Sequence, residues 1–505
     1  MTDHALRVLR KNPRLAELAA YPFNFDIGRA AHGHVEEVRL ASGGPLDIVA
    51  GDDTGGTYFV CADGSMLYAD SEGSAGIVGS SVDEALEIMI GLEEAEDDEE
   101  DEEEFDGEDD DRDGAERSRL PRLEAARTEL RAALGFPERS PAELEAMLRA
   151  ALLRTEPDFL LLNGAEHNAY QLLDSYPRPP LWEPVLASGR ADLTLLRAGD
   201  GVAWDAVAGD PVRRRLALRA AQFDRAEGDL ELLRNLLRHE TRSSMTDELR
   251  LAAVLVGLRG DVGDLPLLHE VRETDFDTAC GLGGMPEPDA SSQELRDWAQ
   301  GLDDSLFGTD PADEPVATWT DLARDQGMTE LARVTLIREL DAIVMDQSRL
   351  RRPDAPQALN TATLGALAGD FKELGDLTQA LRAQRLHAAL QETAWHRVSA
   401  RLTQARLERA DSQLEQAVQT LAALRKILAA PGDDSLRHWE GVNLGRFIAE
   451  EHYRLTRALA EEALPDEARM LLPAADAILG ELSENAAKGV RELAEETAAL
   501  VRELS

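Results

Sequence analysis

Two segments decide the fold: Asp210–Leu233, DPVRRRLALRAAQFDRAEGDLELL, and Asp247–Leu268, DELRLAAVLVGLRGDVGDLPLL. Both end in the unit Gly-Asp-Leu-x-Leu-Leu, which begins at Gly228 and again at Gly263, 35 residues later. Each unit follows a stretch rich in Leu, Ala and Arg. A self-similar period of this length is typical of stacked helix pairs, because one pair alone cannot bury its apolar rows.

This sequence pattern resembles HEAT-like repeats, and the resemblance implies a helical array over residues 209–280. We expect each glycine to end one helix and the following aspartate, Asp229 or Asp264, to cap the next. Two clear copies are fewer than the three that a stable array needs. Flanking helices must therefore supply the missing caps.

The flanking regions are also read as mainly helical. Residues 119–208 are expected to hold helices over 120–134 and 140–153, followed from residue 156 by proline-rich connections without long helices. Residues 281–316 are poor in periodicity and predict a long loop or insertion. Residues 317–505 predict a helical bundle or degenerate, tetratricopeptide-like repeats, with one long helix over 395–430 and a helical hairpin of 450–463 with 467–482.

Between Glu93 and Asp111, 16 of 19 residues are Asp or Glu. Like-charge repulsion at this density opposes collapse, so residues 93–118 are expected to form a disordered acidic linker. A sharper hypothesis makes this run a decoy for a cationic surface on a partner. Without the run the chain still has a formal charge of −29, so its acidity is general.

Residues 1–92 predict a small α+β module. Strands are expected over 35–40, 46–50, 57–62, 65–69 and 75–78, with a hairpin turn at Asp63-Gly64. Ser81 with Glu84 is a capping box that opens a closing helix. The predicted fold class is thus mainly α and multidomain: a small α+β N-terminal module, a disordered acidic linker, then an α-helical solenoid or bundle.

Within this module, residues 52–59 (DDTGGTYF), the acidic turn 70–73 (DSEG) and the helix of 80–92 resemble the SUKH superfamily of immunity and regulatory domains. The resemblance covers about residues 40–92, and Tyr21–Phe25 departs from the opening helix motif of that family. It implies an immunity protein that neutralises a bacterial toxin by direct binding. The residues expected to contact the partner are Asp52, Asp53, Tyr58, Tyr68, Asp70 and Glu72.

The amino-acid composition limits the classes of molecule that can bind this chain. The chain has 505 residues, with 98 Asp and Glu against 53 Lys and Arg, a formal charge of −45. Such a chain should be repelled by nucleic acid and by anionic lipid, whereas a basic protein is a suitable partner and self-association is allowed. The chain has only two cysteines, and its sequence pattern shows neither a targeting segment nor a membrane span. Both observations favour a location in a reducing cytoplasm.

Catalytic signatures are missing from the sequence, which lacks the phosphate-loop, dinucleotide, zinc-protease and nucleophile-elbow motifs. The pairs His32/His34 and Glu166/His167 lack further ligands or catalytic partners at a recognisable spacing. We therefore expect no enzyme activity, cofactor or metal. Two alternatives to the immunity hypothesis stay open: a general helical-repeat scaffold with a regulatory N-terminal module, and an unrecognised hydrolase in residues 156–208.

Overall fold

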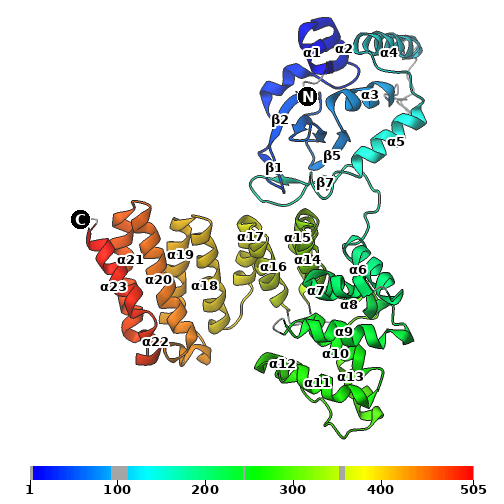
Figure 1. Cartoon of the computed structure of the whole chain (residues 1–505). Coiled ribbons are helices and arrows are strands. Elements are labelled where there is room, and N and C mark those ends of the chain that lie inside the picture. The colour runs from blue at the N-terminus through cyan, green and yellow to red at the C-terminus, as the bar shows by residue number, and fades with distance from the viewer. Residues whose placement is uncertain (1–3, 93–111, 200, 243–244, 352–358, 504–505) are drawn as a thin grey trace, which may run out of the picture. The chain divides into compact units, whose positions relative to one another are not determined.

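The computed structural model describes residues 4–92, 112–199, 201–242, 245–351 and 359–503 (Figure 1). The chain divides into two compact units, residues 1–165 with 169–335 and residues 336–505 with 166–168. Helices dominate both units, and strands occur in the first, so the predicted class, mainly α with a small α+β N-terminal region, is confirmed. Of the expected linker, residues 93–111 lie outside the described residues, and residues 112–118 form the start of helix α4 (Arg112–Leu134).

The N-terminal region is built on a five-stranded sheet of order β2-β3-β4-β5-β7. Four of its strands form an antiparallel meander close to the predicted strands: β2 (Leu46–Gly51), β3 (Thr57–Cys61), β4 (Met66–Ala69) and β5 (Ser74–Gly79). Gly64 has a φ of 92°, a conformation that glycine adopts without steric cost, so the Asp63-Gly64 turn forms as expected.

The boundary expected at residue 92 is wrong, because two later strands complete this region. β6 (Leu161–Asn163) pairs with β1 (Val38–Leu40) in a separate two-stranded sheet, and β7 (Gln171–Leu172) pairs in parallel with β5, the last strand of the meander. Unpaired backbone groups at a sheet edge need hydrogen-bond partners, and these distant segments supply them.

Helices cover the five-stranded sheet and close its core: α1 (His4–Lys11), α2 (Pro13–Ala20), α3 (Val82–Leu92), α4 and α5 (Pro141–Leu152). The capping box that opens α3 is shared between two serines. Ser81 Oγ accepts from the Glu84 N–H at 3.1 Å, while the Glu84 carboxylate accepts from the backbone N–H and hydroxyl of Ser80. The expected helix over 140–153 is confirmed as α5.

The rest of the first unit is a helical array, running from α6 (Trp182–Arg197) and α7 (Gly201–Gly209) through α8 (Pro211–Phe223), α9 (Leu230–Glu240), α10 (Asp247–Gly257), α11 (Leu265–Arg272), α12 (Phe276–Gly281) and α13 (Ser292–Leu306) to α14 (Val316–Asp325). Two expectations are wrong here. Pro184 lies in the first turn of α6, where proline is tolerated, so a 16-residue helix forms in the proline-rich region. Residues 281–316 contain α13, which a Ser291/Glu294 capping box starts.

The aspartates of the repeat do not cap helices. Gly228 and Gly263 lie in short 3-10 turns, and neither Asp229 nor Asp264 makes a side-chain cap hydrogen bond to the helix that follows it, α9 or α11. Both carboxylates are buried and accept from an arginine one helix pair earlier, from Arg197 Nη2 at 2.8 Å and from Arg234 Nη2 at 2.9 Å. The repeated unit is therefore an interhelical ion pair.

The second unit consists of helical hairpins that follow α15 (Thr329–Met345): α16 (Ala362–Glu373), α17 (Leu377–Ala389), α18 (Ala394–Ala410), α19 (Leu414–Ala429), α20 (Asn443–Glu461), α21 (Pro465–Glu481), α22 (Glu484–Lys488) and α23 (Arg491–Glu503). The single helix expected over 395–430 is wrong, because the chain turns at residues 411–413, where Ser412 has a φ of 58°. The hairpin expected near 450–482 is confirmed as α20 with α21.

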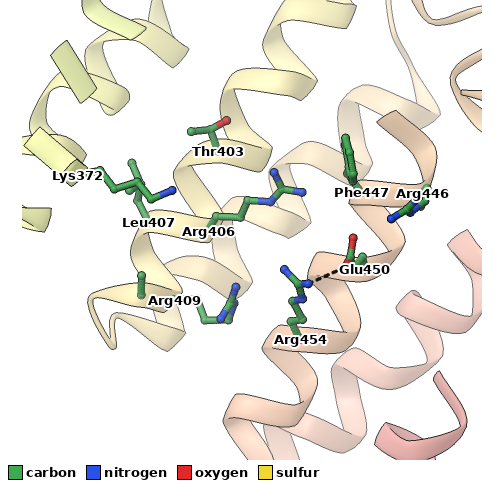
Figure 2. Close-up of a pocket in the computed structure, with 10 residues that line it drawn as sticks. Lys372, Thr403, Arg406, Leu407, Arg409, Arg446, Phe447, Glu450 and Arg454 are labelled. Carbon is green, nitrogen blue, oxygen red and sulfur yellow. Dashed lines mark hydrogen bonds and ion pairs between the residues drawn. The ribbon is translucent and has the colours of Figure 1, made fainter. Parts of the chain in front are cut away.

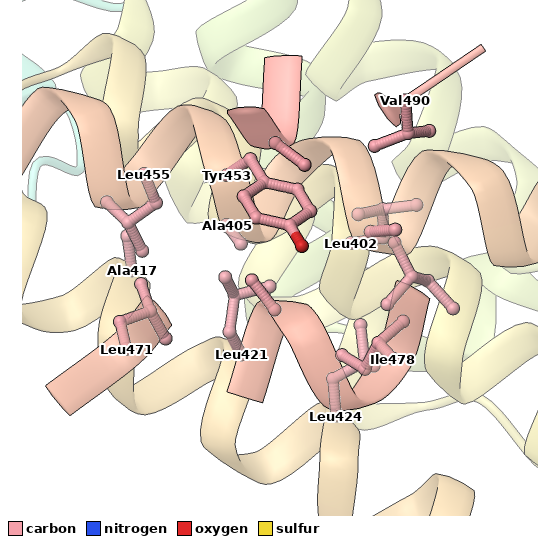
Figure 3. Close-up of a cluster of buried hydrophobic side chains, with 14 of the residues drawn as sticks. Leu402, Ala405, Ala417, Leu421, Leu424, Tyr453, Leu455, Leu471, Ile478 and Val490 are labelled. Carbon is pink, nitrogen blue, oxygen red and sulfur yellow. The ribbon is translucent and has the colours of Figure 1, made fainter. Parts of the chain in front are cut away.

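Figure 3 shows the apolar core of this unit, in which Leu402 and Ala405 of α18 meet Leu421 of α19 and Tyr453 of α20. The phenol of Tyr453 donates to Asp476 at 2.7 Å, so its one polar atom is satisfied. Across the described ranges, no helix combines the length and the apolar character needed to cross a bilayer.

Candidate functional site

The six residues predicted to bind a partner divide into an interior and an exposed set. Asp52 and Tyr58 are each only 6% exposed. The Asp52 carboxylate accepts from the backbone N–H of Thr54 at 2.9 Å, from that of Gly56 at 2.7 Å and from the hydroxyl of Tyr68 at 2.5 Å. Burial alone would raise the pKa of Asp52, but these hydrogen bonds outweigh it and hold the pKa below its usual value.

Asp52 therefore organises the turn over residues 52–56, and Tyr58 packs inside the module with its ring 4.8 Å from that of Tyr68. Neither is accessible to a partner, which corrects their assignment as contact residues. Asp53 and Glu72 are exposed, while Tyr68 and Asp70 are half-buried.

The turns that carry these residues adjoin, since Ser71 Oγ donates to the carbonyl of Thr54 at 3.2 Å. Asp70 accepts from the N–H groups of Glu72 and Ser74, both at 2.8 Å, which shapes the second turn. Asp53 and Glu72 thus lie on neighbouring exposed turns and form what we call the acidic edge.

The two histidines of the N-terminal region have different surroundings. His32 is exposed, whereas the His34 ring lies between Thr57 Oγ1 at 3.0 Å and the Tyr170 hydroxyl at 3.1 Å. Burial lowers the pKa of His34. In the part of the chain that the structure describes, no three His, Cys, Asp or Glu side chains are grouped so that they could hold a metal ion.

A pocket of about 710 Å³ in the second unit is a candidate binding site (Figure 2). Its walls come from α16, α18 and α20. Five of its side chains are cationic and one is a carboxylate, in a chain whose formal charge is −45. The lining residues are Lys372, Thr403, Arg406, Leu407, Arg409, Ala410, Arg446, Phe447, Glu450 and Arg454. We call this site the cationic pocket.

Helical spacing places these charges together. On α20, Arg446, Glu450 and Arg454 recur every four residues and so share one face, while Ile448 and Leu455 point to the buried core. On α18, Arg406 follows Thr403 by three residues, and the opposite face carries apolar core residues. The amphipathic pattern that buries one face of each helix leaves its cationic face toward the pocket.

The carboxylates near the pocket neutralise only part of this charge. Glu451 is 1% exposed and accepts from Arg409 Nε at 2.7 Å and Nη2 at 3.3 Å, with Arg406 Nε 3.6 Å away. Arg454 pairs with Glu450 at 2.6 Å along the same helix. Arg446 forms no ion pair with any described residue, and the pocket keeps a positive charge.

Phe447 holds two guanidinium groups in place. The Cζ atoms of Arg406 and Arg446 lie 5.2 and 5.7 Å from its ring centroid, within the range of cation–π attraction. The Nε atoms of both arginines are buried and lack a hydrogen-bond partner among the described atoms. Guanidinium groups that line the pocket and are held by a ring contact are suited to bind an oxyanion such as a carboxylate.

Sequence reasoning did not identify the cationic pocket, because its residues come from helices up to 82 positions apart. The available signal was the local excess of arginine on 401–409 and 446–457 in an acidic chain. Comparisons with family models, with curated proteins and with solved structures find no match to this chain.

Proposed function

We propose that this chain is a non-catalytic protein-interaction protein whose second unit binds an acidic segment of a partner protein in the cationic pocket. The observation that carries the proposal is the positive charge retained there, including an Arg446 that has no ion pair among the described residues, in a chain of net charge −45. This is the scaffold hypothesis, with its binding site assigned.

The overall charge limits the kind of partner. A large acidic protein would be repelled at long range, but the Debye length at physiological ionic strength is about 8 Å, so distant charges are screened. Contacts inside the pocket lie within a few ångströms and are screened much less. The partner should therefore present a short acidic segment, because a broad acidic surface would meet the remaining carboxylates of this chain.

The test uses the full chain and a fluorescein-labelled peptide that carries three glutamates, with its glutamine counterpart as the uncharged reference. Fluorescence anisotropy should show binding of the glutamate peptide only. Arg446→Gln and Lys372→Gln should each weaken binding about five-fold, the effect of losing about 1 kcal/mol of ion pairing.

Lys426→Gln is the matched control, since Lys426 is an exposed residue of α19 outside the pocket, and the substitution makes the same change in charge. It should leave binding unchanged. Equal losses in Lys372→Gln and Lys426→Gln would point to a non-specific charge effect and would remove the pocket from the proposal.

A second candidate, neutralisation of a basic toxin by a SUKH-like N-terminal region, is favoured by the acidic edge. Asp53 and Glu72 are exposed on adjoining turns, where they are available to a cationic surface. Affinity capture from the native cell extract at low salt should then yield one basic protein that high salt releases. Loss of that protein with the double variant Asp53→Asn, Glu72→Gln would support this function, and its retention would contradict it.

A further inference from the structure

We propose that the acidic segment binds in an extended conformation along α18, with its acidic end in the cationic pocket and its uncharged end in a neighbouring polar pocket. This inference rests on the proposed function and specifies the conformation, length and charge pattern of the segment. It is drawn entirely within the second unit.

The polar pocket has a volume of about 640 Å³ and lies beside the N-terminal half of α18. Its side chains carry hydroxyl, amide and imidazole groups, among them Thr361 of the segment before α16, His387 near the end of α17 and Gln391 just after that helix. Thr403 lines both pockets, so the two adjoin at this residue. We call the two adjoining pockets together the α18 groove.

One face of α18 forms the floor of this groove. The residues of α18 that line the two pockets recur every three or four positions: His396, Ser399, Ala400, Thr403, Arg406, Leu407 and Ala410, with Arg409 beside them. The opposite face carries Val398, Leu402 and Ala405, which are buried in the core. The groove face is thus one continuous stripe of the helix, open where its neighbours leave it uncovered.

The length of this stripe sets the length of the ligand. From His396 to Ala410 there are 14 residue steps, which at 1.5 Å each span about 21 Å. An extended chain advances about 3.3 Å per residue, so about six residues fill the groove. A helical ligand of the same span would need about 14 residues.

The chemistry of the walls favours an extended chain over a helix. A helix satisfies its own backbone and docks through an apolar stripe, whereas an extended segment needs hydrogen-bond partners for its backbone. Here the polar pocket offers side-chain groups that are already oriented. His387 Nδ1 donates to the carbonyl of Thr361 at 2.8 Å, and Gln391 Nε2 donates to Thr361 Oγ1 at 3.1 Å.

The charges at the two ends of the groove determine which end of the bound segment is acidic. Glu392 is exposed at the rim of the polar pocket, so a carboxylate bound there would meet a like charge. Arg446 and Lys372 stand at the opposite end of the groove. The bound segment should therefore be acidic only at the end that lies against Arg406 and Phe447.

The experiment measures the anisotropy of labelled peptides with the full chain. Peptides of three and six residues share two glutamates at one end, and the six-residue peptide is made with these glutamates at either terminus and in the middle. The six-residue peptide with terminal glutamates should bind about ten-fold more tightly than the three-residue one, and moving the glutamates to the middle should remove most of that gain.

Two variants locate the uncharged end. Ser399→Trp should fill the polar pocket and lower the affinity of the six-residue peptide to that of the three-residue one, without weakening the three-residue peptide. Gln416→Trp, at an exposed position of α19, is the control. Glu392→Lys, at an exposed residue, provides an independent test that does not depend on filling a pocket: a six-residue peptide with glutamates at both ends should gain about five-fold.

The outcomes separate the two proposals. If no acidic peptide binds, the proposed function fails. If acidic peptides bind and Arg446→Gln weakens them, but length, Ser399→Trp and Glu392→Lys have no effect, the cationic pocket stands and the extended binding along α18 is wrong. The same holds if only a peptide of stable helical content binds.

Discussion

Acidification should destabilise the second unit through one buried histidine. His452 of α20 is fully buried, its Nδ1 lies 2.8 Å from the carbonyl of Ile448, and its Nε2 lies 3.0 Å from Nη1 of Arg425. Nδ1 therefore donates, and Nε2 must accept from the guanidinium. Burial, with the neighbouring Arg425 charge, lowers the pKa of His452 to about 4.

The sign and the size of the change in unfolding free energy with pH follow from proton linkage. Above about pH 6.5 the imidazole is neutral in both states and contributes nothing to the pH dependence. Between about pH 6.5 and pH 4 the unfolded chain binds a proton that the folded chain does not, so stability falls as the pH falls. Because the pKa of His452 is about 6.5 in the unfolded chain and about 4 in the folded chain, the free energy of unfolding falls by about 2 kcal/mol at pH 5. The loss approaches about 3 kcal/mol below pH 4.

Hydrogen exchange at the α20 amides, followed by mass spectrometry, measures the free energy of opening of this helix without requiring the whole chain to unfold in one step. His452→Gln keeps an acceptor for Arg425 and a donor for Ile448 but cannot titrate. Between pH 7.5 and pH 5 the native chain should lose about 2 kcal/mol more than this variant. His438→Gln, at an exposed histidine, should behave like the native chain. Parallel profiles for the native chain and His452→Gln would refute the assignment.

Three further outcomes are expected. Glu240→Gln should cost about 3–5 kcal/mol in urea unfolding of the first unit, because Glu240 is fully buried against Arg214 and Arg215, whereas Glu231→Gln at an exposed pair should cost under about 0.5 kcal/mol. Phe447→Leu should weaken the glutamate peptide about two- to five-fold, as fewer contacts orient the two guanidinium groups, and should lower the melting temperature slightly because Phe447 also packs against the core. The affinity for that peptide should change little from 10 to 50 mM salt, because salt first screens the long-range repulsion between the peptide and the acidic chain. Above 150 mM the affinity should fall, because salt then also screens the attraction inside the pocket. A steep loss of affinity already between 10 and 50 mM salt would contradict this prediction.

Local signals in the N-terminal region were sufficient to predict the meander. The Asp63-Gly64 turn and the alternation on either side of it identify β3 and β4, since a hairpin depends on neighbouring residues. The return of β6 and β7 from residues 161–172 was not predictable in this way. These strands are two or three residues long, and their pairing is decided by which backbone groups of β1 and β5 remain open in the folded region.

The repeat at residues 210–268 was correctly read as helix pairs, but the role of its aspartates was not. An aspartate at the start of a helix is usually a cap, so the sequence favoured capping for Asp229. Its actual partner, Arg197, lies 32 residues earlier on α6, a distance at which sequence alone gives no pairing rule. The Arg213–Arg215 run shows the same limit, because its buried Arg214 pairs with Glu240, 26 residues later in the chain.

Composition and structure carry different information about the cationic pocket. With 98 carboxylates against 53 basic side chains, a typical cation of this chain has acidic neighbours to pair with, and Arg409 and Arg454 in the pocket do pair. A cation that stays without an ion pair in such surroundings is therefore more informative than one in a neutral protein. Arg446 is in this position, with a buried Nε and a ring contact that fixes its plane. An unsatisfied buried donor costs about 1–3 kcal/mol, and no acceptor for Arg446 Nε is found among the described residues, so Arg446 is the residue whose substitution tests the proposed binding most directly.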